Sequence, residues 1–158
     1  PAEETSSSRS VDRVSPSLPS ASRNGEGATV SAPPSPDVLA LARSFAERFG
    51  SFSNQSDFAN LRELKALMTV SMQEWADRSI TNARAKAHAP DEYYGITTRA
   101  LLSNVLAMDE AGGMGEVLVK TSRREVKGVT APRVFYQDLL LTLKKEEGGW
   151  RVEKATWK

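Results

Sequence analysis

The chain has 158 residues, 39% of them hydrophobic, and its formal net charge at pH 7 is +1. This length fits one domain with a tail, and so small a charge argues against a general binder of nucleic acid. The chain has no cysteine and a single histidine, His88. Disulfides, zinc–thiolate sites and thiol nucleophiles are therefore excluded, and we expect neither a bound metal nor a cofactor.

Residues 1–35 are rich in serine, proline, alanine and glycine. Such a segment buries too little apolar surface to offset the entropy of ordering, so it predicts a disordered linker. A semi-extended linker of this kind is typical of a tether between a membrane anchor and a folded head, although a tail without a role has the same composition. No run approaches the roughly 18–20 apolar residues of a membrane span. We expect any anchor to precede Pro1.

Three helices are expected before the first long strand. The first begins at Pro36, after a capping serine, and ends at Gly50. The second runs from about Asp57 to Leu67, with Ser56 or Asp57 as its cap. The third opens at Thr69 or Ser71 and runs to about Ala87. The side chains expected to fill the core are Phe45, Phe49, Trp75 and Leu141.

Four long antiparallel strands are expected in the rest of the chain. Their predicted bounds are 94–108, 115–127, 134–145 and 150–157, with glycine-containing turns or loose loops between them. Strands of this length bend or carry bulges, because flat sheets of that length are rare. In the third strand, alternation places Phe135, Gln137, Leu139 and Leu141 on one face and Tyr136, Asp138, Leu140 and Thr142 on the other.

This order of elements resembles the nuclear-transport-factor-2-like superfamily of α+β cones over residues 36–158. The resemblance rests on the order itself, on the helix with Phe45-x-x-x-Phe49 that would plug the cone, and on Met68-Thr69 and Trp150-x-Val152. It implies an α+β fold in which N-terminal helices pack on a strongly curved four-stranded antiparallel sheet. The superfamily includes isomerases and dehydratases, and also periplasmic scaffold domains of type IV secretion and conjugation, which hang from a membrane helix by a linker. The Ser/Pro-rich tail resembles the latter arrangement.

Candidate acid and base groups occur near the expected mouth of the cone. Histidine is the side chain whose ordinary pKa best suits a general base, which makes His88 a candidate, but a histidine at a helix end also caps carbonyls or lies in water. Asp91 and Glu92 precede Tyr93 and Tyr94. A carboxylate beside two phenols could shuttle protons, while acidic residues after a proline also serve as turn residues and tyrosines line a rim.

The role expected of Asp138 depends on which face of the sheet it occupies. If it faces the cone, burial raises its pKa and makes it a candidate base; if it faces outward, it pairs with Arg123 or Arg124 across the sheet, which we favour. The basic stretch on the second strand lacks the interleaved aromatic residues of a single-strand nucleic-acid site. It reads as a solvated sheet face or as a surface for an acidic protein. Its members are Lys120, Arg123, Arg124 and Lys127.

The sequence favours a non-catalytic binding or assembly module, tethered to a membrane and extracytoplasmic, that binds a protein partner or a second copy through its sheet. The alternative is a small lyase or isomerase acting on a hydrophobic ligand in the cone, with a cytoplasmic location as the alternative setting. A cone filled by aromatic side chains and leucines would leave no room for a substrate. The candidate pocket or interface residues are Tyr93, Tyr94, Arg124, Tyr136 and Asp138.

Overall fold

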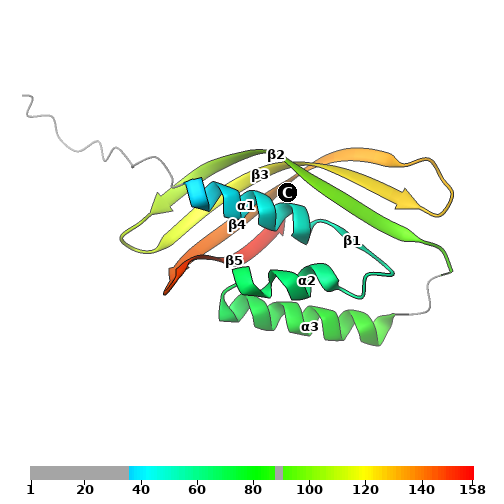
Figure 1. The fold of residues 1–158 in the computed structure, drawn as a ribbon, viewed down its shortest axis with the longest axis horizontal. Coiled ribbons are helices and arrows are strands. Elements are labelled where there is room, and N and C mark those ends of the chain that lie inside the picture. Colours follow the sequence, from blue (N-terminus) through cyan, green and yellow to red (C-terminus); the bar gives the residue numbers. More distant parts are fainter. Residues whose placement is uncertain (1–35, 88–90) are drawn as a thin grey trace, which may run out of the picture. The chain divides into compact units, whose positions relative to one another are not determined.

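The computed structural model describes residues 36–87 and 91–158; the expected linker at residues 1–35 and His88 lie outside the described residues. The elements are helix α1 (Pro36–Phe49), strand β1 (Phe52–Ser53), helix α2 (Ala59–Leu64), 3₁₀ helix η1 (Lys65–Leu67), helix α3 (Val70–Lys86), and strands β2 (Tyr94–Asp109), β3 (Met114–Lys127), β4 (Arg133–Glu146) and β5 (Gly149–Trp157). Figure 1 shows helices first and a long antiparallel sheet after them. The predicted α+β class is therefore confirmed. Within the described ranges, no helix is both long and apolar enough to cross a membrane.

The sheet has the strand order β1-β2-β3-β4-β5, and every neighbouring pair is antiparallel. It has five strands rather than the expected four, because Phe52 and Ser53, which lie between the first two helices, pair with Ile96 and Gly95. The register between β2 and β3 shifts at two points, between Ala100 and Leu102 and again further along the strand. Irregularities of this kind bend long strands, as expected from their length.

The hydrophobic core lies between the helices and the inner face of the sheet. Alternate residues of β3 and β4, such as Val117 and Leu139, are fully buried, and so is Phe45 of α1. Helix α3 adds the stripe Met72, Ala76 and Ile80, whose spacing of four residues keeps them on one side.

Two of the four expected core side chains are fully buried, Phe45 and Leu141. Phe49 is half-buried, and the expectation for Trp75 is wrong, because 42% of its surface is exposed. Trp75 follows Met72 by three residues, which places it at the margin of the buried stripe of α3 rather than in its middle.

The start of α2 differs from the predicted serine or aspartate cap. Phe58 is the N-cap residue, in the left-handed region with φ 58°, and it offers no capping side chain; the preceding Asp57 also has a positive φ, 44°. Residues other than glycine rarely adopt this backbone conformation, because it is strained. The N-cap of α3 is Thr69, one of its two predicted caps, whose hydroxyl accepts a hydrogen bond from the Met72 amide at 3.3 Å.

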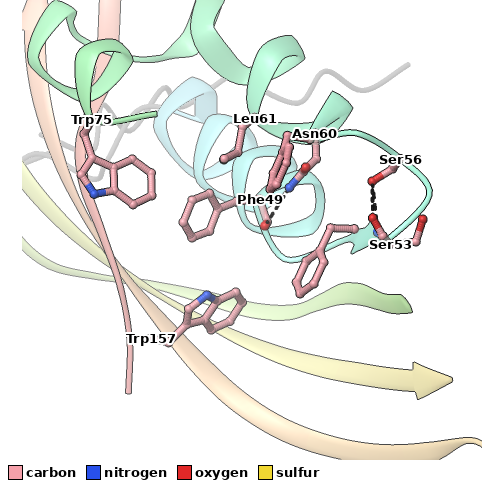
Figure 2. A pocket seen from close by; sticks show the side chains of 9 residues that line it. Phe49, Ser53, Ser56, Asn60, Leu61, Trp75 and Trp157 are labelled. Carbon is pink, nitrogen blue, oxygen red and sulfur yellow. Dashed lines mark hydrogen bonds between the residues drawn. The ribbon is translucent and has the colours of Figure 1, made fainter. Parts of the chain in front are cut away.

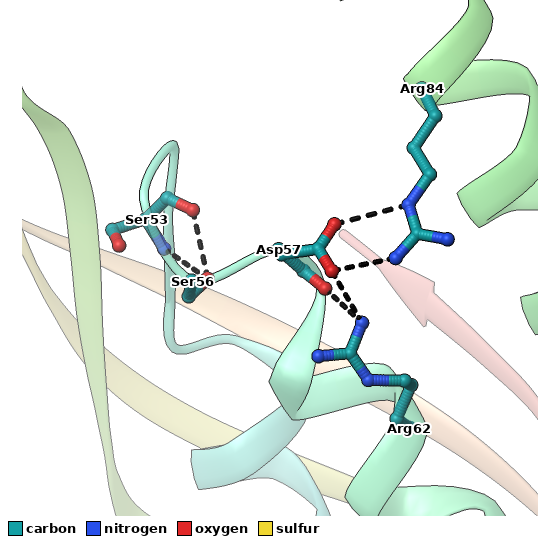
Figure 3. A network of polar contacts seen from close by, with 5 residues as sticks. All are labelled: Ser53, Ser56, Asp57, Arg62 and Arg84. Atoms are coloured by element: carbon teal, nitrogen blue, oxygen red, sulfur yellow. Dashed lines mark hydrogen bonds and ion pairs between the residues drawn. The ribbon is translucent and has the colours of Figure 1, made fainter.

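Asp57 instead joins two helices, and we call Asp57, Arg62 and Arg84 the Asp57 clasp (Figure 3). Its carboxylate accepts hydrogen bonds from Arg84 Nε at 3.0 Å and Nη2 at 2.6 Å, and from Arg62 Nη1 at 3.0 Å. These bonds, first to Arg84 and then to Arg62, hold the pKa of Asp57 below its ordinary 3.8. The clasp therefore ties the strained turn to both α2 and α3.

The lowered pKa of Asp57 predicts how the clasp responds to acid. The ionised carboxylate stabilises the folded chain above the ordinary pKa of 3.8, and this contribution is lost as the pH falls through the lower folded-state value. We expect Asp57→Asn to lower the midpoint of urea unfolding at neutral pH and to converge with the parent chain in strong acid. Glu116→Gln, on an exposed carboxylate of β3, is the control and should show no such convergence. A deficit that stays constant into acid would contradict the role of the charge.

Candidate functional site

The five residues singled out in the sequence fall into two groups. Tyr94 is the first residue of β2 and Tyr93 comes just before it, whereas Arg124, Tyr136 and Asp138 lie on β3 and β4. In β4 the odd-numbered Leu139 and Leu141 are fully buried, so the even-numbered residues face the opposite side. The predicted alternation of β4 is thus confirmed, and Tyr136 is 76% exposed on the outer face.

Tyr94 is bound by the carboxylate of Glu125 on β3, and not by that of Asp91 or Glu92, which precede it in the chain. Its hydroxyl donates to Glu125 Oε1 at 2.9 Å, and Glu125 Oε2 accepts from Arg133 Nε at 3.0 Å. Burial, and then this hydrogen bond, raise the pKa of Tyr94 above its ordinary value of 10.0. A phenol whose pKa is raised is a poor proton donor near neutral pH. The hydrogen bond between Tyr94 and Glu125 therefore serves to join β2 to β3 and does not fit a proton shuttle.

One face of the sheet lies on the side away from the helices (Figure 1). Exposed apolar side chains gather on this outer face. Leu118 and Leu140 are direct cross-strand partners there, and Val134 and Tyr136 follow along β4 with 56% and 76% of their surfaces exposed. On β2, Leu102 is 51% exposed and pairs with Lys120. We call this set the outer sheet face: Leu102, Leu118, Lys120, Arg124, Val134, Tyr136, Asp138 and Leu140.

Asp138 belongs to this outer face, but its expected cross-strand partner is wrong. The residue opposite Asp138 is Lys120, while Arg124 lies opposite Thr97 on one side and Val134 on the other. Asp138 therefore lies on the face of the sheet opposite the helices, where it cannot act as a base on a ligand held between the helices and the sheet. With Lys120 and Arg124 it supplies charged groups around the apolar part of the outer sheet face.

Arg123 lies on the inner face, contrary to the expectation of a solvated basic stretch, and only 6% of it is exposed. Its guanidinium donates from Nη1 to Gln137 Oε1 at 2.6 Å, from Nε to Thr98 Oγ1 at 3.2 Å and from Nη2 to the Gly50 carbonyl at 3.3 Å. The carbon of the guanidinium also lies 4.1 Å from the ring centroid of Trp157. Burial lowers the pKa of the Arg123 guanidinium below its ordinary value.

A cavity of about 260 Å³ opens beside Trp157, as Figure 2 shows. Aromatic side chains therefore line an open space here and do not fill it. None of the side chains that line this cavity is titratable, so the pair of acid and base groups that an enzyme would need does not converge there. The lining residues are Phe49, Phe52, Ser53, Ser56, Phe58, Asn60, Leu61, Trp75 and Trp157. Among the residues with described positions, no cluster of acidic, histidine or cysteine side chains is arranged to hold a metal ion.

No protein-family model matches the chain, and no curated protein matches it in sequence. Solved structures share its fold, and three of them are named for secretion or conjugation. CagV, a VirB8 homologue of the type IV secretion system of Helicobacter pylori strain 26695, is 12% identical with a TM-score of 0.56, over 77% of this chain and 95% of that one. An IcmL-like type IV secretion system protein of Legionella pneumophila is 9% identical with a TM-score of 0.59, over 80% and 93% of the two chains.

The third structure is the TraH protein of the Gram-positive conjugative plasmid pIP501. It is 13% identical, with a TM-score of 0.54, over 81% of this chain and 96% of that one. Identities this low establish a common fold and no common activity. The resemblance read from the sequence is confirmed at that level: this chain has the fold of VirB8-like and IcmL-like proteins of type IV secretion and of a conjugative plasmid protein.

Proposed function

We propose that residues 36–158 form a non-catalytic assembly module that binds a protein partner through the outer sheet face. The observation that carries this proposal is the exposure of Tyr136, Val134 and Leu102 on a side of the sheet that the helices leave open. The likeness to structures named as type IV secretion and conjugation proteins supports it.

The composition of the outer sheet face suits a protein partner. Tyrosine and arginine are enriched among the residues that dominate binding energy, and Tyr136 lies close to Arg124 because Arg124 pairs with Val134, two residues before it. Full burial of a large apolar side chain contributes roughly 1.5–3 kcal/mol. Lys120 and Asp138, which face each other across the strands, place opposite charges beside the apolar centre and so favour one orientation of the partner.

The edge of β2 next to this face adds a second source of contacts. Up to Ala100, α1 and the segment that follows it satisfy the strand edge. The Thr98 amide donates to Ser51 Oγ at 2.8 Å, and the Ala100 amide donates to Glu47 Oε1 of α1 at 2.9 Å. Past Ala100, Leu101 and Leu106 are about half exposed. Among the described strands, only β3 pairs with this part of β2. A partner that covers the outer sheet face can therefore extend onto this edge.

We further propose that residues 1–35 connect the module to a membrane and that the module works on the extracytoplasmic side. The support is the linker composition together with the fold likeness to proteins named for secretion and conjugation. The proposal concerns placement alone, and the binding proposed for the outer sheet face does not depend on it.

Photo-crosslinking in the native cells tests the binding proposal. A photoreactive phenylalanine at Tyr136 of the full chain should form one dominant adduct with a protein, because that side chain would lie inside the interface. The same group at Val129, a fully exposed loop residue between β3 and β4, is the matched control and should give no such adduct. Equal adduct patterns from both positions, or none from Tyr136, would contradict the proposal. The adduct mass separates a second copy of the chain from a different partner.

The lack of cysteine allows a direct test of the location. A single cysteine introduced by Val129→Cys should react in intact cells with a maleimide that does not cross membranes. Val117→Cys, which is fully buried, should react only after denaturation and serves as the control. Labelling of Val129→Cys that requires lysis of the inner membrane would place the module on the cytoplasmic side.

A further inference from the structure

We propose that the aromatic cavity beside Trp157 is a binding site for a small, neutral, flat aromatic molecule that carries one N–H or O–H donor. This site lies on the inner side of the sheet, apart from the outer sheet face, and adds a ligand to the assembly role. The cavity is formed by residues from separate parts of the chain, namely the end of α1, β1, the start of α2, the first half of α3 and the end of β5.

The walls favour a flat ring. Phe49 stacks on Trp157 with centroids 6.2 Å apart and an angle of 21° between the planes, and Trp75 lies 6.2 Å from Phe49 on another side. Phe52, Phe58 and Leu61 complete an almost wholly apolar lining, and Figure 2 shows the labelled side chains around the opening. Aromatic rings prefer offset-stacked or edge-to-face neighbours at this range of distances, and a planar ligand can offer both.

The size of the cavity limits the ligand. Its volume of about 260 Å³ lies between the roughly 150 Å³ of an apolar cavity that binds benzene and the roughly 300 Å³ at which drug-sized pockets begin. A ligand of two fused rings fits this interval. Because the lining has no titratable side chain, a charged ligand would lose its hydration without gaining a counter-charge, and a neutral one is favoured.

Asn60 explains why the ligand should carry a donor. Its Nδ2 donates to the Phe49 carbonyl at 3.3 Å, which directs the amide and leaves Oδ1 as an acceptor. This Oδ1 is buried and has no hydrogen-bond partner among the described residues. Buried polar atoms in native proteins are nearly always paired, and an unpaired one calls for an explanation. Asn60 is among the lining residues, so in this proposal a small turn of its amide toward the cavity brings Oδ1 to an N–H or O–H group of the ligand, which supplies the missing donor.

Two features outside the lining hold the walls in place. The buried guanidinium of Arg123 lies against the ring of Trp157, which fixes that wall from the sheet side. The Asp57 clasp ties down the turn in which Phe58 has its left-handed backbone, and Phe58 contributes its side chain to the cavity. Strained residues that are held by their surroundings cluster at binding sites. The cavity is therefore preorganised, which lowers the entropic cost of binding.

Indole and benzofuran provide a matched pair of probes, because they share a shape and differ in the N–H group. We would titrate each into the full chain and follow the backbone and tryptophan side-chain N–H signals by NMR. The expected result is saturable shifts at Trp75 and Trp157, no shift at Trp150 near the other end of β5, and about tenfold tighter binding of indole than of benzofuran. Shifts scattered over the surface, or centred on Trp150, would overturn the proposal.

Three variants sharpen the test. Leu61→Trp should fill the cavity and abolish binding of both probes, and Asn60→Leu should bind both with equal affinity because the acceptor is gone. Tyr136→Ala, on the outer sheet face, should bind both as the parent chain does, so failure of this proposal is separable from failure of the assembly role. Thermal melting checks that each variant is folded. Unchanged binding by Leu61→Trp overturns the site, and a preference for indole that survives in Asn60→Leu overturns the role of Asn60.

Discussion

The buried guanidinium of Arg123 is the interaction on which the inner side of this fold depends. Through hydrogen bonds to Gly50, Thr98 and Gln137 and through its contact with Trp157, it joins the end of α1 to β2, β4 and β5. A buried charge is costly to remove from water, and the cost is offset only where its donors are satisfied. The polar residues near it, Thr98 and Gln137, are on the inner face for that reason.

This joint also explains the close approach of α1 to the sheet and the position of the cavity. At Gly50 a β-carbon would collide with the side chain of Thr98, so glycine is needed where the helix end meets β2. The Thr98 hydroxyl donates to the Gly50 carbonyl at 2.7 Å, the same oxygen that Arg123 reaches. Phe49 and Trp157 are thereby brought together, and the space that they leave toward Trp75 is the cavity. The outer sheet face is independent of this arrangement, so one sheet presents two unlike surfaces.

The sequence was most informative where a pattern repeats over many residues. The bounds of α1, the four long strands and the two faces of β4 follow from capping residues and from periods of 3.6 and 2. The same alternation places Arg123 on the inner face with Val119 and Thr121. The alternation alone would have predicted that Arg123 is buried, but its charge favoured a solvent-exposed position. Gln137, a polar residue on an apolar face, was the second signal for the buried cation.

Other features had no pattern to reveal them. Strand β1 is two residues long, and its pairing with β2 depends on tertiary approach. The left-handed backbone at Asp57 and Phe58 is held by arginines 5 and 27 residues away in the chain, so no local rule predicts it. Whether Trp75 fills the core or lines a cavity depends on a small rotation of α3, which the spacing of its apolar residues does not determine.

The stability of Arg123→Met, measured by urea unfolding of the full chain, tests the central role of the buried cation most directly. Methionine keeps much of the length and the apolar stem but removes the donors to Gln137 Oε1 and Thr98 Oγ1, while the Gly50 carbonyl keeps the Thr98 hydroxyl as a donor. The account predicts a loss of about 2–4 kcal/mol in the free energy of unfolding, partly recovered when Gln137→Leu is added in the same chain. An Arg123→Met chain as stable as the parent, or more stable, would contradict it.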